Sequence, residues 1–427
     1  MKVTKAIKEA FPVRDRVCRS GMLGAMIGDI SGSAHEGVNS NIFNPSYQFF
    51  NRQSTLTDDS VQTAAVAEWL LHRGTLPLKE ALLTWARLFP HAGYGSGFRH
   101  FIKTGQSYRS NANGAAMRIS PVSEYVSSLE EALSLARESA IPTHADGGVK
   151  GAQAIAAAAF IARDGVARNK PVADVKREMK EFVKERFGYN LDVTIEELRE
   201  QSKEYARKRL SAQEGGSTPS ECVSIANADL SCPAALIAVL GGETYEQVIR
   251  LAVSTGGDSD TIAAMAGSIA AQLYGIPDTL VERALVFLPS EVVEVINAFE
   301  RLSLTSSKQT PPHCRRWTPR ECIVYGEAPE GVSAEEGKAE TVLSRFNHHP
   351  AQGYPILTVG KTLEEICSGV KGFLRYAKDH PETRFHVRRV GYDKAGYTVE
   401  QIATMFRGAL ELSNVLLPEE MLGEIAG

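Results

Sequence analysis

The sequence lacks a strong excess of charge of either sign. Its 427 residues include 47 Lys and Arg against 51 Asp and Glu, which gives a formal net charge of −4. A surface for nucleic acid or anionic lipid needs a basic excess, so neither partner is indicated. Short basic pairs such as Arg315-Arg316 are most simply solvated.

Long apolar runs and a cysteine framework are also missing. Polar residues interrupt every Ala-rich stretch, so no segment predicts a transmembrane helix. The start, Met1 to Lys5, lacks the apolar region of a signal peptide, and we therefore expect a cytoplasmic protein. The six cysteines are scattered, as in a reducing compartment, and no CxxC pair supports a zinc site.

The most informative stretch is Thr255-Gly256-Gly257-Asp258-Ser259-Asp260-Thr261, which opens an Ala-rich run that ends near Ala271. Two glycines permit a sharp turn, and the run that follows predicts a helix buried on nearly all sides. Helix N–H groups favour carboxylates on the first turn by about 0.3–1 kcal/mol each, but a buried pair of acids needs a cation. An ordinary capped helix start is the alternative interpretation.

A second cluster of the same kind begins another expected helix. Thr57-Asp58-Asp59-Ser60 precedes Val61–Leu71, where apolar residues recur at helical spacing and Thr57 or Asp58 can cap the start. Capping explains two such clusters poorly. Together they offer four carboxylates and two hydroxyls, an all-oxygen set that suits Mg²⁺, Mn²⁺ or Ca²⁺ rather than zinc.

Three further segments contain polar residues beside expected helices. The apolar stretch 18–28 is expected to be a helix that ends at Asp29, with Glu36 in the turn beyond, although a loop with solvated charges is the alternative. The loop 107–118 is rich in small and amide side chains and suits a phosphate, although a plain polar turn is the alternative. His144 precedes the Ala-rich helix 151–162 and either orients a ligand or caps the helix.

The chain changes character after residue 303. Residues 304–345 are rich in Ser, Pro, Gly and Glu and are expected to be a linker. Residues 346–427 then predict strands at 354–359, 384–390 and 413–418, with helices at 363–378 and 399–409. We therefore expect a main domain over 1–303, a linker, and a small α/β module.

These motifs, in this order, resemble the ADP-ribosylglycohydrolase family, which includes the dinitrogenase reductase-activating glycohydrolases. The matching segments are Gly24–Asp29 with Glu36-Gly37, Thr57–Ser60, Asn113–Arg118, His144 and Gly256–Thr261. The resemblance covers residues 18–303 and implies an all-α orthogonal helical bundle with a binuclear Mg²⁺ or Mn²⁺ site. It implies a hydrolase that removes ADP-ribose from a modified protein or other acceptor.

The resemblance also assigns expected roles to residues. The implied metal ligands are Thr57, Asp58, Asp59, Asp258, Asp260 and Thr261. The residues expected to act in catalysis are Glu36, Asp59 and Asp258, and those expected to bind substrate are Ser110, Asn111, Asn113, Gly114 and His144. The chain departs from the family at Ala112, where glycine is usual, and at 31–35, the residues that precede Glu36.

The C-terminal module has a separate resemblance. Ala395-Gly396-Tyr397 and Asn414–Glu419 are similar to a short α/β region of bacterial and prophage proteins for which no activity is secure. The appended module leaves a second hypothesis open, in which the protein is a non-catalytic ADP-ribose binder or an immunity protein that blocks an ADP-ribosyltransferase toxin. The retained acidic set favours the enzyme.

Overall fold

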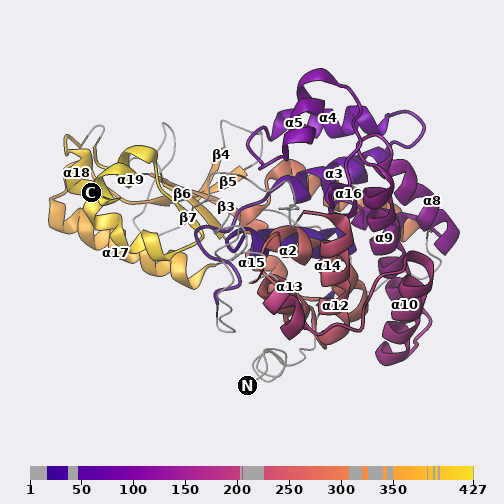
Figure 1. Cartoon of the computed structure of the whole chain (residues 1–427). Coiled ribbons are helices and arrows are strands. Elements are labelled where there is room, and N and C mark those ends of the chain that lie inside the picture. The colour runs from indigo at the N-terminus through magenta and orange to yellow at the C-terminus, as the bar shows by residue number, and fades with distance from the viewer. Residues whose placement is uncertain are drawn as a thin grey trace, which may run out of the picture. The chain divides into compact units, whose positions relative to one another are not determined.

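The computed structural model describes residues 17–36, 47–201, 204, 226–306, 320–325, 340–343, 350–381, 383–387, 390–392 and 395–426. The chain forms two compact units. The first comprises Met1–Phe49, Ser54–Val281 and Glu294–Arg316, and the second comprises Phe50–Gln53, Glu282–Val293 and Trp317–Gly427. The expectation of an all-helical main part and a small C-terminal α/β module is confirmed (Figure 1).

The helical unit consists of amphipathic and fully buried helices. Its elements up to the second acidic cluster are β1 (Val17–Cys18), α2 (Gly21–Ser33), α3 (Asp58–Leu71), α4 (Leu78–Leu88), α5 (Ser96–Thr104), α6 (Gly114–Met117), α7 (Ser120–Tyr125), α8 (Leu129–Ala140), α9 (Asp146–Ala167), α10 (Val172–Phe187), α12 (Ala228–Gly241) and α13 (Tyr245–Ser254). They are followed by α14 (Ser259–Tyr274), β2 (Ile276–Pro277) and α15 (Asp278–Ala284), whose first residues complete this stretch of the unit. Element η1 (Leu285–Phe287) belongs to the second unit, and α16 (Ser290–Ser306) returns to the first unit from Glu294 onward.

Among the described helices of this unit, the most extensive contact joins α2 and α14, which lie side by side (Figure 1). Glycines on α2 permit the approach. A Cβ atom placed on Gly24 would lie 2.5 Å from the carbonyl oxygen of Gly267, and one on Gly32 would lie 2.5 Å from the Cα of Asp260. Gly28 faces the backbone of Ala263 still more closely. The two backbones therefore touch, and any side chain at these positions would separate them.

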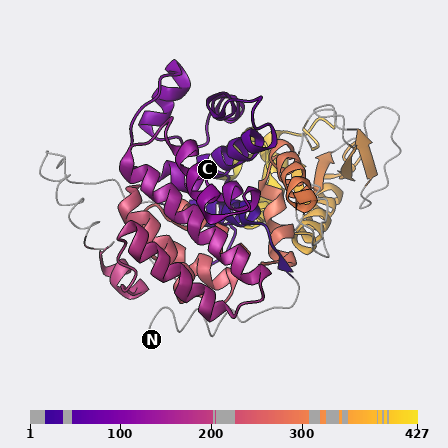
Figure 2. The same cartoon turned by 90° about the vertical axis from the view of Figure 1, so that its right-hand side faces the viewer.

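Helix α9 lies at the centre of the helical unit. Its alanine-rich run, residues 154–159, is fully buried, as its composition predicts. It packs against α8, α10, α12 and α14, and the turned view of Figure 2 shows the purple and magenta helices of this region side by side. The first residues of α9 follow His144, so this rigid helix supports one of the residues expected to bind substrate.

The first helix differs from its expected bounds. Cys18 belongs to β1, which pairs with β2, and Ser20 caps α2 by accepting a hydrogen bond from the N–H of Leu23. The helix continues through Ser31 and Gly32, so Asp29 lies inside it and not at its end. The reason is the contact with α14, since burial of these small residues outweighs their weak helix preference.

The second unit contains a mixed five-stranded sheet. Its strands are β3 (Arg320–Tyr325), β4 (Glu340–Leu343), β5 (Pro350–Pro355), β6 (Thr383–Val387) and β7 (Val415–Leu416), in the order β4-β5-β3-β6-β7, with only β4 antiparallel to its neighbour. Its C-terminal helices are α17 (Leu363–Asp379), α18 (Val399–Ala403), η2 (Thr404–Glu411) and α19 (Glu419–Ala426). Phe373, Phe385 and Phe406 form the centre of the core.

Residues 304–345 are not simply a linker. Strand β3 lies within this stretch and occupies the middle of the sheet, and β4 forms its edge. The remaining residues of the stretch, 307–319, 326–339 and 344–345, lie outside the described residues. The expected strand 354–359 is also displaced, because β5 begins at Pro350. Among the described residues, no helix has both the length and the apolar character that crossing a bilayer requires.

Candidate functional site

The two acidic clusters meet where α2, α3 and α14 come together. Thr57 is the N-cap of α3, as expected, and its hydroxyl accepts a hydrogen bond from the N–H of Asp59. Before α14, Gly256 and Gly257 adopt φ values of 75° and 77°, a left-handed conformation that favours glycine. The hydroxyl of Ser259 then donates to the carbonyl of Gly32 at 3.1 Å and fixes the start of α14 on α2.

Five carboxylates gather at this junction in two overlapping groups. The first group is Asp29, Asp59 and Asp260, and the second is Glu36, Asp258 and Asp260; within each group the carboxylate oxygens lie within 4.8 Å of one another. Asp260 belongs to both groups. The first is buried, whereas the second reaches the surface through Glu36. The structure therefore brings together residues that are more than 200 positions apart in the chain.

Asp58 was expected to be a ligand, but among the described residues it belongs to neither group. Its Oδ2 atom accepts a hydrogen bond from Gln62 Nε2 at 2.8 Å. Asp29, in contrast, was not among the residues expected in the site, but it belongs to the first group. The sequence signal was a single acid in an otherwise uncharged run of small and apolar residues, a position where an unpaired charge is costly.

Asp29 links helix α2 to the start of α3. Its carboxylate accepts hydrogen bonds from the backbone N–H of Thr57 and of Ser60, both at 3.1 Å, and from both side-chain hydroxyls, that of Thr57 at 2.7 Å. Four donors on one carboxylate leave it little capacity to bind anything else. Asp29 is therefore placed to orient the first turn of α3, including Asp59.

Asp59 lies at the centre of the acidic junction. Thr261 donates to Asp59 Oδ2 at 3.1 Å, and Thr57 is within 3.4 Å of the same oxygen. Its other oxygen, Oδ1, is buried and has no hydrogen-bond partner among the described residues. Buried oxygens are rarely left unpaired, so Oδ1 is a free ligand atom in a cluster that contains only oxygen donors. These residues fit a hard divalent cation.

Burial and mutual repulsion make the acids of the junction hard to ionise. Burial raises the pKa of Asp29 to about 6 and that of Asp58 to about 7, and in Asp58 the nearby Asp29 and Asp258 add to the effect. The pKa values of Asp59 and Asp260 are raised well above the usual range, first by burial and then by neighbouring carboxylates. Among the described residues none of these acids forms an ion pair, so a cation would relieve the repulsion.

The expected substrate loop lies beside this junction. Ser110 pairs with His144 through a backbone bridge, and the carbonyl oxygen of the side chain of Asn111 accepts from the N–H of Gly147 at 3.1 Å. Gly114 begins α6, and His144 Nε2 would lie 3.3 Å from a Cβ atom placed there. The structure thus brings the five residues expected to bind substrate into one region.

Asn113 has a different part from the one expected. Its side-chain nitrogen donates to Asp258 Oδ2 at 2.6 Å and to Ser231 Oγ at 3.1 Å, while its backbone N–H donates to the carbonyl of Ala226 at 2.7 Å. All three N–H bonds are used within the protein. Asn113 therefore orients Asp258 and has no N–H left to donate to a substrate. The side-chain hydroxyl of Ser110 and the amide N–H groups of Asn111 donate to no described residue.

The comparison with known families agrees with this geometry. The sequence pattern of the ADP-ribosylglycohydrolase family matches residues 12–309, more than half of the chain. The chain belongs to this family. A solved structure described as an "ADP-ribosylglycohydrolase-related protein complex" is 25% identical, covers 67% of this chain and 98% of its own, and has a TM-score of 0.46. Among curated proteins there is no match.

Family membership makes the chain an ADP-ribosylglycohydrolase-type hydrolase, and such enzymes usually use divalent metals. The two acid groups supply residues that could hold such ions. The family pattern ends at residue 309, so the sheet of the second unit lies outside it. The acidic junction and the expected substrate loop all lie within the matched part.

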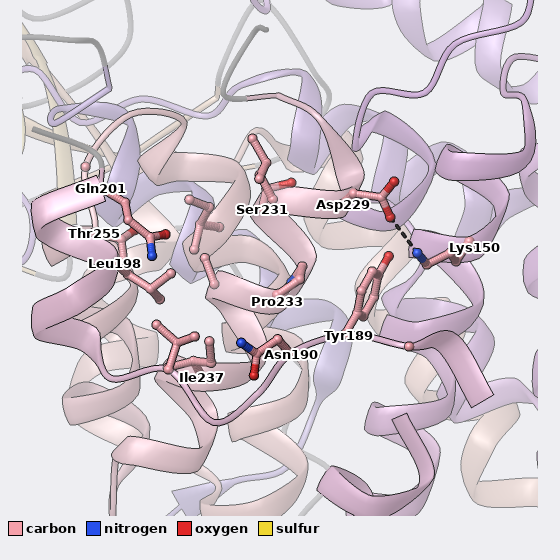
Figure 3. A pocket seen from close by; sticks show the side chains of 16 residues that line it. Lys150, Tyr189, Asn190, Leu198, Gln201, Asp229, Ser231, Pro233, Ile237 and Thr255 are labelled. Carbon is pink, nitrogen blue, oxygen red and sulfur yellow. Dashed lines mark ion pairs between the residues drawn. The ribbon is translucent and has the colours of Figure 1, made fainter. Parts of the chain in front are cut away.

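A pocket of about 510 Å³ adjoins the site (Figure 3). Figure 3 shows the Lys150–Asp229 ion pair, 2.7 Å long, beside Tyr189. The Tyr189 hydroxyl is buried and has no hydrogen-bond partner among the described residues. Ser231 and Gly256 also line the pocket. Ser231 accepts a hydrogen bond from Asn113, and Gly256 lies two residues before Asp258. The pocket is therefore lined in part by residues that neighbour the acidic junction.

Proposed function

We propose that this protein hydrolyses the bond between ADP-ribose and a modified acceptor, and so reverses mono-ADP-ribosylation. The reaction would use two divalent cations, Mg²⁺ or Mn²⁺, held by the acidic junction. Family membership supports the type of reaction, and the structure supports the site. The observation on which the proposal depends is that Asp260 belongs to both carboxylate groups, with an oxygen within 4.8 Å of Asp59 in one group and of Asp258 in the other.

The residues that would hold the cations follow from their free oxygens. Asp59, Asp258 and Asp260 would supply carboxylates, Thr57 and Thr261 would add hydroxyl oxygens, and Asp58 would contribute its second oxygen at the rim. Among the described acids, Asp260 belongs to both groups, so it would be available to a cation in either group. When bound, the ions would polarise the substrate's ribose and lower the pKa of a water molecule.

The chain's own side chains would perform the remaining steps. Glu36 is the exposed member of its group, and burial together with Asp258 and Asp29 raises its pKa. An accessible carboxylate with a raised pKa is suited to accept a proton from water and return it to the leaving acceptor, so Glu36 is the proposed general base. Ser110, Asn111 and Gly114 would donate to the pyrophosphate, and His144 would contact the ribosyl-phosphate part.

The proposal is tested by measuring ADP-ribose release from ADP-ribosylated arginine, serine and nucleic-acid substrates with Mg²⁺ or Mn²⁺ present. We expect release from at least one substrate and none from Asp260→Asn. The matched control is Asp174→Asn, an acid on the surface of α10 that pairs with Arg177 and should leave activity unchanged. Binding of ADP-ribose without release from any substrate would refute the enzymatic function. Full activity of Asp260→Asn would refute the proposed ligands.

A further inference from the structure

A buried chain of hydrogen bonds connects His144 to the acidic junction through Arg118. We propose that Arg118 is a positioning residue that, through Thr143, holds His144 as a neutral imidazole with its proton on Nε2, so that this N–H is a fixed donor to a substrate oxygen. The hydrogen bonds alone determine that the ring proton of His144 lies on Nε2. The use of the donor on an ADP-ribosyl group rests on the proposed function.

Arg118 is the centre of this chain. Its side chain is completely buried, and its guanidinium donates to Gln62 Oε1 at 2.8 Å, to the carbonyl of Ser139 at 2.8 Å and to Thr143 Oγ1 at 2.9 Å. No described carboxylate forms an ion pair with it. Because a guanidinium only donates hydrogen bonds, the direction of each of these bonds is certain. Its partners must present an oxygen to it.

The hydroxyl of Thr143 transmits this direction to His144. Thr143 Oγ1 lies 2.8 Å from His144 Nδ1 and already accepts from Arg118. If Nδ1 carried the proton, the single hydroxyl proton of Thr143 would have no acceptor among the described residues, at a fully buried position. An unpaired buried donor is costly, so the hydroxyl donates to Nδ1 and the ring proton resides on Nε2.

The imidazole of His144 also remains uncharged. Burial and the positive charge of Arg118 lower the pKa of His144 to about 3. A neutral ring with its proton on Nε2 presents one N–H, and no described residue accepts a hydrogen bond from it. This atom faces Gly114, where a side chain would come within 3.3 Å of it. The free N–H therefore lies at the start of α6, beside the expected substrate loop.

The other arm of Arg118 reaches the acids. Since Gln62 must present its oxygen to Arg118, its amide nitrogen points to Asp58 and donates to Oδ2 at 2.8 Å. Asp58 Oδ2 is thereby occupied and Oδ1 is left for another partner. The buried guanidinium of Arg118 thus orients two groups: the carboxylate of Asp58 at the acidic junction and the N–H donor of His144 at the substrate loop.

The inference is tested first on the unchanged protein by NMR of samples with ¹⁵N-labelled histidine. The shifts of the two ring nitrogens distinguish the two neutral forms, and the signals of His144 are those lost in His144→Gln. At pH 7 we expect a protonated Nε2 and an unprotonated Nδ1. A proton on Nδ1, or a charged ring, would overturn the proposal.

A pair of variants then tests the positioning role. Thr143→Val removes the hydroxyl and is expected to give a mixture of the two ring forms, with KM for an ADP-ribosylated substrate raised about tenfold and kcat within about twofold. Thr143→Ser keeps the hydroxyl and should resemble the unchanged protein in both readouts. Unaltered signals and KM in Thr143→Val would overturn the role of the hydroxyl. If no substrate is turned over, the NMR result still decides the position of the proton, and only the proposed function fails.

Discussion

At the scale of single residues, the raised pKa values of the acidic junction predict how stability depends on pH. A carboxyl whose pKa is higher in the folded than in the unfolded protein stabilises the fold at low pH and loses that effect as pH rises through the folded value. Asp29 and Asp58, with pKa values of about 6 and 7, should therefore lower the free energy of unfolding between pH about 4 and 7. Melting temperatures measured in EDTA across this range check the prediction, and a value that does not fall would contradict it.

The same reasoning predicts that Asp59→Asn stabilises the metal-free protein. The substitution removes one of several buried, mutually repelling charges, so at pH 8 in EDTA we expect the melting temperature to rise by roughly 2–4 °C. Added Mn²⁺ should raise the melting temperature of the unchanged protein but not of this variant. Asp174→Asn is the control, and its melting temperatures with and without Mn²⁺ should equal those of the unchanged protein. A lower melting temperature in Asp59→Asn would show that its carboxylate is held by partners and not repelled.

Asp29→Asn separates orientation from metal binding. The amide keeps the size of the side chain but cannot accept all four hydrogen bonds from Thr57 and Ser60. Because Asp29 orients α3 and is not itself a proposed ligand, we expect Mn²⁺ to bind roughly 10–100-fold more weakly, measured by calorimetry. Asp260→Asn should abolish binding altogether. Equal losses in the two variants would indicate that Asp29 is a ligand.

At the scale of secondary-structure elements, the sequence predicts the starts of the helices that build the site. Thr57-Asp58-Asp59 and the Gly-Gly-Asp stretch each combine capping residues with a buried helix, and both signals are local. The contact of Asp29 with Ser60 is not local, and neither is the link from Asp58 through Gln62 to Arg118. These depend on which helices become neighbours, so composition and spacing do not contain them.

The contact between α2 and α14 can be tested at Gly28. A methyl group on Gly28 would overlap the backbone of Ala263, which cannot move aside as a side chain could. We expect Gly28→Ala to reduce the free energy of unfolding by about 1–3 kcal/mol and to weaken metal binding. Gly95→Ala is the control, because no atom lies within 4 Å of its added methyl group, and its effect should stay below about 1 kcal/mol. Urea unfolding measures both, and equal midpoints would contradict the close approach.

At the scale of the whole molecule, the division into a helical part and an α/β module was predictable, but the boundary was not. Strand β3 is short, and the Pro- and Gly-rich segments on either side of it are typical of a linker, although Ile323-Val324-Tyr325 itself favours a strand. Its place in the middle of the sheet follows from parallel pairing with β5 and β6, which are distant in the chain. Asn414 also has a role invisible in the sequence, since its amide lies 2.9–3.0 Å from the carbonyls of Ala377, His380 and Thr383.

This division predicts that residues 1–303 alone are less stable than the full chain. Element η1 contacts strands β3 and β6, so removing the sheet would uncover the apolar side chains of Leu285 and Val286, which are now buried. We expect a lower melting temperature and aggregation that increases with concentration, while Mn²⁺ still binds because every proposed ligand precedes residue 262. The same shortened chain with Leu285→Ser and Val286→Asn should remain monomeric in light scattering, since it no longer exposes an apolar patch. The prediction would be contradicted if the shortened chain without these substitutions were monomeric and melted at the same temperature as the full chain. In that case the fold of η1 would not depend on the sheet, and the expected domain boundary near residue 303 would be correct.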